Sequence, residues 1–369
     1  MPKLPQASTH IRSASMAAPI PVSSPALNPQ TNPRTLVRDE SLDIAKGFGI
    51  ILVVLGHTML GLINSDFFST PRVWPDATTF TIYAFHMPLF FVISGHLASG
   101  KHRPAGTTIA RLIPTIVYPY FLWSIVQGLS QVLMTKYTTS HVPISALAKI
   151  LWVPIVPYWF LYALFFCHLG YLAIRKLTQG LQLTLAMLLY LAVMLLFRQL
   201  GHRLPLIVSE TARGFVFYVL GAVSVGLVKR FGLRTALIAT AAFAVTAWIV
   251  YHSHWPGLVV SFVTLGLASA GIAATLAWSR LLAPHRNAVI RTLAFLGAYS
   301  MSIYVIHILI TASVRIVLKR LGAHDSVIFT MIEIAASTSL GVSIPLGINW
   351  IVSRLSLDRW FGLQHMNTA

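Results

Sequence analysis

The chain is divided into a succession of apolar segments, each close in length to the roughly 20 residues that a helix needs to cross a bilayer. Of its 369 residues, 56% are hydrophobic and only 10% are charged, whereas a typical soluble domain carries about 25% charged residues. We expect ten spanning helices, at residues 43–62, 79–99, 112–134, 158–174, 178–197, 207–228, 235–251, 257–279, 292–314 and 327–352. The predicted fold is therefore an all-α, polytopic membrane bundle.

The residues outside these spans form short connections and two tails. Residues 1–37 contain seven prolines among many Ser, Asn and Thr residues, and they lack the apolar run of a secretory signal. We expect a disordered cytoplasmic tail over 1–37, a membrane domain over 38–355 and a short cytoplasmic tail over 356–369. The apolar stretch 143–157 is short and interrupted by prolines, so we expect it to lie at the membrane interface.

Basic residues far outnumber acidic ones, at 27 Lys and Arg against 9 Asp and Glu, for a net charge of +18. A large basic excess often indicates nucleic-acid binding, but here the basic residues lie mostly between apolar segments. With ten spans, seventeen of them fall on the N-terminal side and nine on the opposite side. The positive-inside rule then places both termini in the cytoplasm. We expect a multi-pass protein of the cytoplasmic (inner) membrane, in contact with lipid and not with nucleic acid.

The first span carries ionisable residues, which are costly in a bilayer and often mark function. Lys46 and His57 are eleven residues apart. At about 100° per residue they share one face of a helix, about 16 Å apart along its axis. Asp43 precedes Lys46 by three residues and can pair with it. A snorkelling Lys and a packing His remain the simpler interpretation, but the shared face favours a functional role for all three residues.

Two further spans carry polar residues on otherwise apolar helices. The second contains His86, then Pro88, which removes a helical hydrogen bond, and later Ser94-Gly95, where a neighbour or ligand can approach closely. The ninth carries a polar stripe that should face the bundle interior, either as part of a site or to hold helices together. Its members are Ser300, Tyr304, His307 and Thr311.

Other polar and aromatic residues suggest packing roles as well as binding roles. Glu210 and Arg213, three residues apart, can pair within one helix. Glu333 has no cation nearby on its own helix, so it requires a partner from another helix. The pair Tyr158-Trp159 at the start of the fourth span is typical of an interfacial aromatic belt.

With these features the chain resembles a known family, the acyltransferase-3 family of integral membrane acyltransferases. Within that family it resembles the branch similar to fucose 4-O-acetylases. Two motifs carry the resemblance most specifically. One is Leu42-Asp43 with Lys46-Gly47 and ten residues between Lys46 and His57; the other is 85–91 (FHMPLFF) running into Ser94-Gly95. Weaker matches are Arg111-Leu112-Ile113-Pro114 with Tyr118-Pro119-Tyr120, and Ser302-Ile303-Tyr304 with His307.

The resemblance implies transfer of an acyl group, usually acetyl, from acyl-CoA as co-substrate to a hydroxyl of a glycan or other small acceptor. It implies His57 as the catalytic histidine and Lys46 as its basic partner. We expect His57 either to act as a general base on the acceptor hydroxyl or to pass the acyl group covalently, with Asp43 orienting Lys46. Many family members carry Arg at the position of Lys46, and Lys lacks the bidentate fork of Arg. The remaining candidate residues, for substrate or donor binding, are His86, Ser94, Gly95, Arg111, Tyr304, His307 and Glu333.

Three other functions compete with a glycan O-acyltransferase. Intramembrane charges also suit a transporter or flippase for a lipid-linked glycan, although no internal repeat of the kind seen in many transporters is evident. The acceptor can instead be a small secondary metabolite. A histidine-ligated metal or haem enzyme is disfavoured because no H-x-x-x-H box occurs; we expect no metal and no bound cofactor. The single cysteine, Cys167, excludes an internal disulfide.

Overall fold

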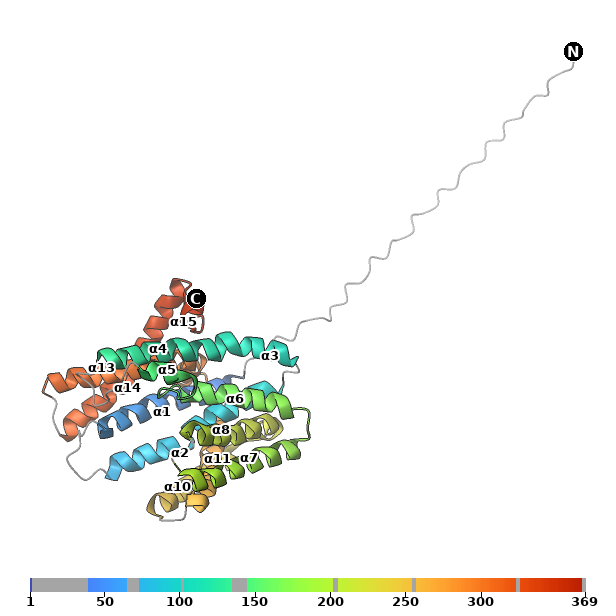
Figure 1. Ribbon diagram of the computed structural model, residues 1–369, viewed down its shortest axis with the longest axis horizontal. Coiled ribbons are helices and arrows are strands. Elements are labelled where there is room, and N and C mark those ends of the chain that lie inside the picture. Colours follow the sequence, from blue (N-terminus) through green and yellow to red (C-terminus); the bar gives the residue numbers. More distant parts are fainter. Residues whose placement is uncertain are drawn as a thin grey trace. The chain divides into compact units, whose positions relative to one another are not determined.

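The computed structural model describes residues 1, 39–64, 73–100, 103–134, 145–201, 205–253, 257–322 and 326–366. The tail expected over 1–37 lies outside these residues, apart from Met1. Throughout the described ranges the regular structure is helical, without strands (Figure 1). The elements are α1 (Glu40–Asn64), α2 (Val73–Ser99), α3 (Ala105–Leu112), the π-helical turn η1 (Ile113–Val117), α4 (Tyr118–Leu133), α5 (Ser145–Ala148), the 3₁₀ turn η2 (Lys149–Leu151), α6 (Trp159–Ile174), α7 (Gln179–Leu200), α8 (Leu206–Val223), α9 (Val225–Val228), α10 (Leu233–His252), α11 (Gly257–Leu282), α12 (Ala288–Ala298), α13 (Ser300–Arg320), α14 (Val327–Arg354) and α15 (Asp358–Phe361).

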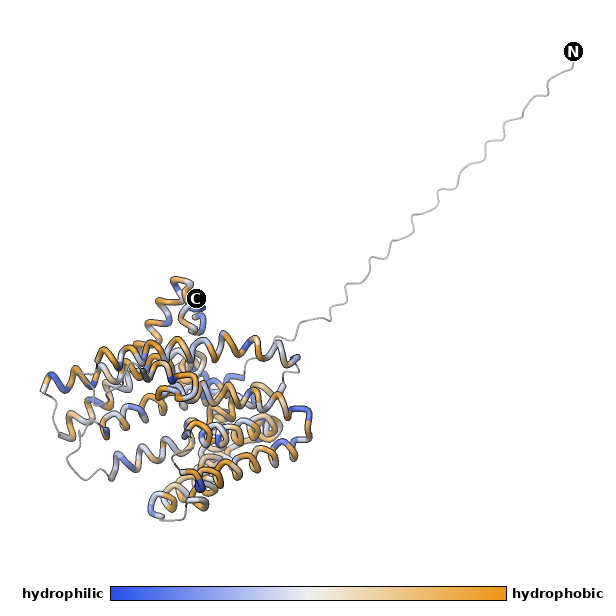
Figure 2. Tube along the Cα trace, in the orientation of Figure 1, coloured by the Kyte–Doolittle hydropathy of each residue, from blue (hydrophilic) through white to orange (hydrophobic). Residues whose placement is uncertain are grey.

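Apolar residues dominate the long helices (Figure 2), as a bilayer requires. Within the described residues, eight helices are long and apolar enough to cross a membrane. The predicted polytopic helical bundle is thereby confirmed. The expected spans 158–174 and 207–228 correspond to α6, of 16 residues, and α8, of 18 residues, which are not among these eight. The total of ten spans and the cytoplasmic position of the termini stay predictions.

The ninth expected span, 292–314, is two helices rather than one. Helix α12 ends at Ala298, and α13 begins at Ser300 after Tyr299, whose backbone angles (φ −107°, ψ 18°) depart from the helix. Both sides of the break are apolar, so the hydropathy pattern does not reveal it. The 11-residue α12 packs along α1, and the helix of spanning length is α13.

Contact between α12 and α1 depends on two glycines that let the backbones meet. A Cβ added at Gly297 would overlap the carbonyl oxygen of Asp43, and one added at Gly47 would overlap the carbonyl oxygen of Leu293. Small residues permit this close approach between helices in membranes. The first half of α1, which carries Asp43 and Lys46, is thereby fixed against α12.

The third expected span, 112–134, lies within a longer continuous helical segment. Helix α3, η1 and α4 together form a run from Ala105 to Leu133, of 29 residues. Two prolines, Pro114 and Pro119, cannot donate backbone hydrogen bonds to the preceding turn. The π-helical turn lies at this point, as such turns often do where the regular ladder is interrupted.

The C-terminal segment folds back onto α4. The hydroxyl of Tyr118 donates to the carbonyl oxygen of Trp360 at 2.6 Å, and the indole of Trp123 donates to that of Phe361 at 3.0 Å. The carboxylate of Asp358 accepts hydrogen bonds from Ser353 and His365. The region expected to be only a short tail therefore contains α15 and is attached to the bundle through residue 366.

The tyrosine of the aromatic pair at the start of α6 is not part of the expected interfacial belt. Tyr158 is 0% exposed, and its hydroxyl donates to the carbonyl oxygen of Val305 on α13 at 2.8 Å. A buried tyrosine satisfies its hydroxyl with such a partner. The prediction for Tyr158 was wrong because local sequence does not reveal that α13 lies beside it.

We predict that Gly297→Ala destabilises the protein, because the added methyl group meets backbone atoms of α1 that cannot rotate away. Overpacking of this kind costs about 1–3 kcal/mol. Thermal unfolding of the detergent-solubilised protein measures the effect as a lower melting temperature.

A matched control for this substitution is Gly266→Ala on α11, where an added Cβ meets nothing within 4 Å. This variant should be as stable as the parent or slightly more so, because Ala favours a helix over Gly. Equal melting temperatures for both variants would contradict the backbone contact between α1 and α12.

Candidate active site

Three histidines from three different helices meet inside the bundle. They are His57 on α1, His86 on α2 and His307 on α13, and their exposed fractions are 8%, 0% and 0%. The ring centroids of His57 and His307 lie 5.1 Å apart in a T-shaped arrangement. The ring of Tyr83 lies 6.0 Å from that of His57 and 4.8 Å from that of His86. We call these four residues the histidine cluster.

The helices themselves set the tautomer of each histidine. The Nδ1 atom of His57 lies 2.9 Å from the carbonyl oxygen of Val53, that of His86 lies 2.7 Å from Ile82, and that of His307 lies 2.7 Å from Tyr304. A carbonyl oxygen can only accept, so Nδ1 carries a proton in each ring. In the neutral ring, Nε2 then holds the lone pair and can accept a proton.

His57 differs from the other two histidines in its accessibility. The Nε2 atoms of His86 and His307 are buried and have no hydrogen-bond partner. The hydroxyl of Tyr83 is also buried and also lacks a hydrogen-bond partner. His57 alone of the three retains some exposed surface. Of the cluster's imidazoles, the one that an incoming group can reach is therefore His57.

Lys46 and Asp43 form an ion pair near the N-terminal end of α1, away from the histidine cluster. The Lys46 ammonium lies 2.6 Å from an oxygen of Asp43, and Asp43 is buried, which confirms the expected pairing. Lys46 and His57 are eleven residues apart, which corresponds to about 16 Å of helix. The pair therefore lies apart from the imidazoles.

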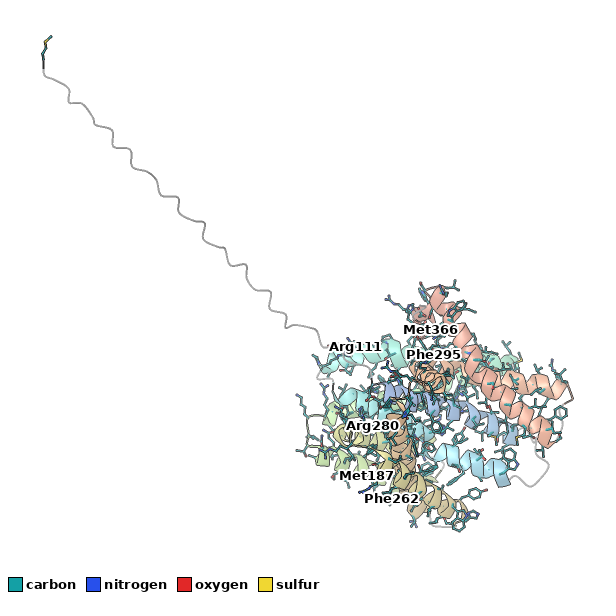
Figure 3. The ribbon with its side chains drawn as sticks, turned by 180° about the vertical axis from the view of Figure 1, so that it is seen from behind. Arg111, Met187, Phe262, Arg280, Phe295 and Met366 are labelled. Atoms are coloured by element: carbon teal, nitrogen blue, oxygen red, sulfur yellow. The ribbon has the colours of Figure 1, made fainter. Side chains whose placement is uncertain are left out.

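Arg111 and Ser94 share a cavity of about 340 Å³ between α2, α3, α6 and α8. Two more arginines, Arg103 and Arg175, line it, and Arg175 donates a hydrogen bond of 2.8 Å to the carbonyl oxygen of Arg103. Arg111 lies on α3 (Figure 3). We call this space the arginine cavity.

The arginine cavity lies toward the Lys46 end of α1. Along the contact between α1 and α2, Gly56 faces Tyr83 whereas Gly49 faces Phe90. The two helices are thus antiparallel, and Ser94 lies further along α2 in the direction of the beginning of α1. A concentration of positive charge and a lysine ion pair therefore share one end of the bundle, and the imidazoles lie deeper.

The structure gives Gly95 a packing position. A Cβ added there would overlap the carbonyl oxygen of Tyr218 on α8, and one added at Gly221 would overlap that of Val92 on α2. These contacts hold α2 and α8 together. Gly95 thus lies against protein backbone, whereas its neighbour Ser94 faces the arginine cavity.

Glu333 lies beyond the histidine cluster, on the side opposite Lys46. It is 0% exposed, neither carboxylate oxygen has a hydrogen-bond partner, and its charge interacts with those of Arg315 and Lys319 on α13. Arg315 lies beside Gly61, one turn past His57 on α1. Positive charge from another helix is therefore near Glu333, but among the described residues no ion pair or hydrogen bond to its carboxylate is formed, and Glu333 is separate from the imidazoles.

The ninth-span stripe faces the interior as predicted. Tyr304, His307 and Thr311 are all buried on α13. The hydroxyl of Tyr304 donates to the carbonyl oxygen of Pro157 at 2.5 Å, so it is engaged in holding α13 beside α6. The other expected helix pair, Glu210 with Arg213 on α8, is also formed.

Sequence reasoning missed three residues that the structure brings to these sites. Tyr83 precedes His86 by three residues and so lies on the same helix face, which is a signal that could have identified it. Arg103 and Arg175 join Arg111 only through the packing of α3 on α6. They are 72 residues apart in the sequence, and no local pattern connects them.

Two known proteins are similar in sequence to parts of this chain. The chain is 28% identical over 191 residues to Nodulation protein NolL of Mesorhizobium japonicum, a match that covers 50% of this chain and 47% of that protein. It is 49% identical over 63 residues to Nodulation protein NolL of Sinorhizobium fredii, covering 17% and 16% of the two chains. The chain thus matches about half the length or less of these relatives, and no solved structure matches it significantly.

A family model settles the relationship over most of the chain. The model described as an acyltransferase domain matches residues 39–350. That range includes the histidine cluster, the Lys46–Asp43 pair, the arginine cavity and Glu333. The chain therefore belongs to the acyltransferase-3 family.

Proposed function

We propose that the protein is a membrane O-acyltransferase that moves an acyl group from acyl-CoA to a hydroxyl of a cell-envelope glycan or related sugar. The observation that carries the proposal is the histidine cluster, in which Nδ1 of His57 is bound to Val53 and its Nε2 lone pair is left for an incoming group. Membership in a family of acyltransferases supports the reaction class.

His57 is the general base of the proposed reaction. An alcohol is a poor nucleophile at neutral pH, and a positioned imidazole that accepts its proton contributes about 10²–10⁴-fold to the rate. Nε2 of His57 takes the hydroxyl proton as the acceptor oxygen attacks the thioester carbon. The tetrahedral intermediate then breaks the carbon–sulfur bond, the ester is released, and the CoA thiolate takes the proton from His57.

The neighbours of His57 restrain its position. The ring of His307 packs edge-on against it, and the ring of Tyr83 lies on another side. Together with the Nδ1 hydrogen bond to Val53, these contacts hold Nε2 in one direction. Positioning of this kind is a large part of what an enzyme contributes to a two-substrate reaction.

The arginine cavity suits the phosphates of the donor. Acyl-CoA is a polyanion, and the planar forks of Arg103, Arg111 and Arg175 match phosphate oxygens in charge and geometry. The Lys46–Asp43 pair lies toward the same end, where Lys46 can add its charge to an anionic portion of the donor. If the termini are cytoplasmic, this end faces the compartment that contains acyl-CoA.

A transporter or flippase for a lipid-linked glycan is the second candidate, favoured by the buried Glu333 and the half-buried Arg315 near it. Radiolabelled acyl-CoA distinguishes the two, because a transporter neither hydrolyses the thioester nor transfers its acyl group. Mass spectrometry of envelope glycans from cells with and without the gene then identifies the acceptor, and would separate a glycan from a small metabolite.

We predict that His57→Ala lowers acyl transfer in isolated membranes at least 100-fold, about the contribution of a general base. The matched control is His252→Ala. His252 has the same hydrogen bond from Nδ1 to the carbonyl oxygen four residues earlier, at 2.9 Å, but it is exposed on α10. Near-normal turnover by correctly inserted His57→Ala protein would remove the catalytic assignment.

We predict that Arg111→Ala weakens acyl-CoA binding about tenfold or more, because a hydrogen bond to a charged group contributes about 1.5–3 kcal/mol. Its matched control is Arg286→Ala, an exposed arginine between α11 and α12 that does not line the cavity. Calorimetric titration with CoA measures both. An affinity unchanged in Arg111→Ala would exclude the arginine cavity as the donor site.

A further inference from the structure

A much smaller cavity lies beside α1 at the level of Ile50 and Val53, between Lys46 and His57 in the sequence. Its volume is about 70 Å³, and α1, α2, α6 and α13 enclose it. Ile50 and Val53 contribute to it from α1, Phe160 from α6, and Met301 and Tyr304 from α13. The sequence motifs and the proposed general-base chemistry give this cavity no role.

Its position on α1 links it directly to His57. Lys46, Ile50, Val53 and His57 follow one another at intervals of four, three and four residues, so they share one face of the helix. The carbonyl oxygen of Val53, a residue that lines the cavity, holds Nδ1 of His57. The cavity therefore lies one helical turn from His57, on the Lys46 side, and Val53 is the residue that connects the two.

The size of the cavity restricts its occupant to a few heavy atoms. An apolar cavity of about 150 Å³ holds benzene, with six carbon atoms. A space of about 70 Å³ accommodates about half as many heavy atoms, which is the size of an acetyl group.

The chemistry of the lining also favours an acyl group over the rest of the donor. The pantetheine arm of CoA carries two amides that require hydrogen-bond partners when buried. The lining is apolar except for Ser300 and Tyr304, and the hydroxyl of Tyr304 is already bound to the carbonyl oxygen of Pro157, so a single hydroxyl is left for two amides. An alkyl or acetyl end fits these surroundings, whereas an amide does not.

Phe160 is a rigid part of the cavity's lining. Its ring is buried and packs against Tyr304, with centroids 5.8 Å apart, and against Phe90, with centroids 6.1 Å apart. Rings held on two sides cannot swing away to admit a longer chain. Met301, which is unbranched and flexible, closes the cavity from α13.

We propose that this cavity holds the acyl group of the donor beside His57, and that Phe160 and Met301 restrict the enzyme to acyl chains of two or three carbons. The inference rests on the proposed acyl-CoA-dependent function and extends it to donor specificity. Each further methylene that a pocket cannot accommodate typically lowers kcat/KM about 10–200-fold. A four-carbon donor exceeds this limit by one methylene and should therefore be at least about tenfold poorer than acetyl-CoA.

The test compares kcat/KM for acetyl-CoA and butyryl-CoA in membranes carrying the parent protein, Phe160→Leu or Met301→Ala. Either enlargement should reduce the preference for acetyl-CoA at least tenfold, mainly through improved use of butyryl-CoA. The matched control is Phe165→Leu on the same helix, which lines a different cavity between α4 and α6. Because both donors are measured on the same preparation, a loss of inserted protein cancels in the ratio.

The possible outcomes separate this inference from the proposed function. Parent membranes that transfer no acyl group from any acyl-CoA would overturn the donor assignment and this inference with it. Parent membranes that use acetyl-CoA and butyryl-CoA equally well, or enlarged variants whose ratio matches that of Phe165→Leu, would overturn the acyl cavity while leaving the acyltransferase function supported. A broadened donor range in both Phe160→Leu and Met301→Ala, and not in Phe165→Leu, supports the acyl cavity.

Discussion

The bilayer offers no water to hydrogen-bond polar groups, and the rest of this structure depends on that constraint. The backbone responds by forming helices, which satisfy their own amides. Several polar side chains of the site likewise find partners inside the protein. The three histidines of the cluster use the carbonyl oxygen of the preceding turn, and Lys46 uses Asp43. These local solutions fix both the tautomer of His57 and the position of the buried charges.

Helix α1 is the element on which the proposed chemistry is arranged. Its one face carries Lys46, then the residues of the small cavity, then His57. Contacts with α2, α11, α12, α13 and α14 surround it. The close approach of α12 at Gly47 and Gly297 restrains the Lys46 half. A polyanionic donor that enters from that end would thus meet, in order, positive charge, a short apolar cavity and a base.

Much of this arrangement was predictable because it is local. Helical periodicity alone places Lys46 and His57 on one face, pairs Asp43 with Lys46, and turns Tyr304, His307 and Thr311 toward the interior. The break at Tyr299 and the burial of Tyr158 were not predictable, because apolar residues flank both and only the neighbouring helix distinguishes the outcomes. The residues of the arginine cavity come from separate helices, so no spacing in the sequence connects them.

The sequence by itself determined that the chain is a membrane helical bundle, since the length and apolarity of its segments leave few other solutions. It also determined the order of functional groups along α1, because an α-helix has a fixed period. Tertiary structure alone decided which histidines meet His57, which arginines share a cavity, and how much space remains beside the base. Those features depend on contacts between residues distant in the chain, and side-chain volume and helix packing set them rather than periodicity.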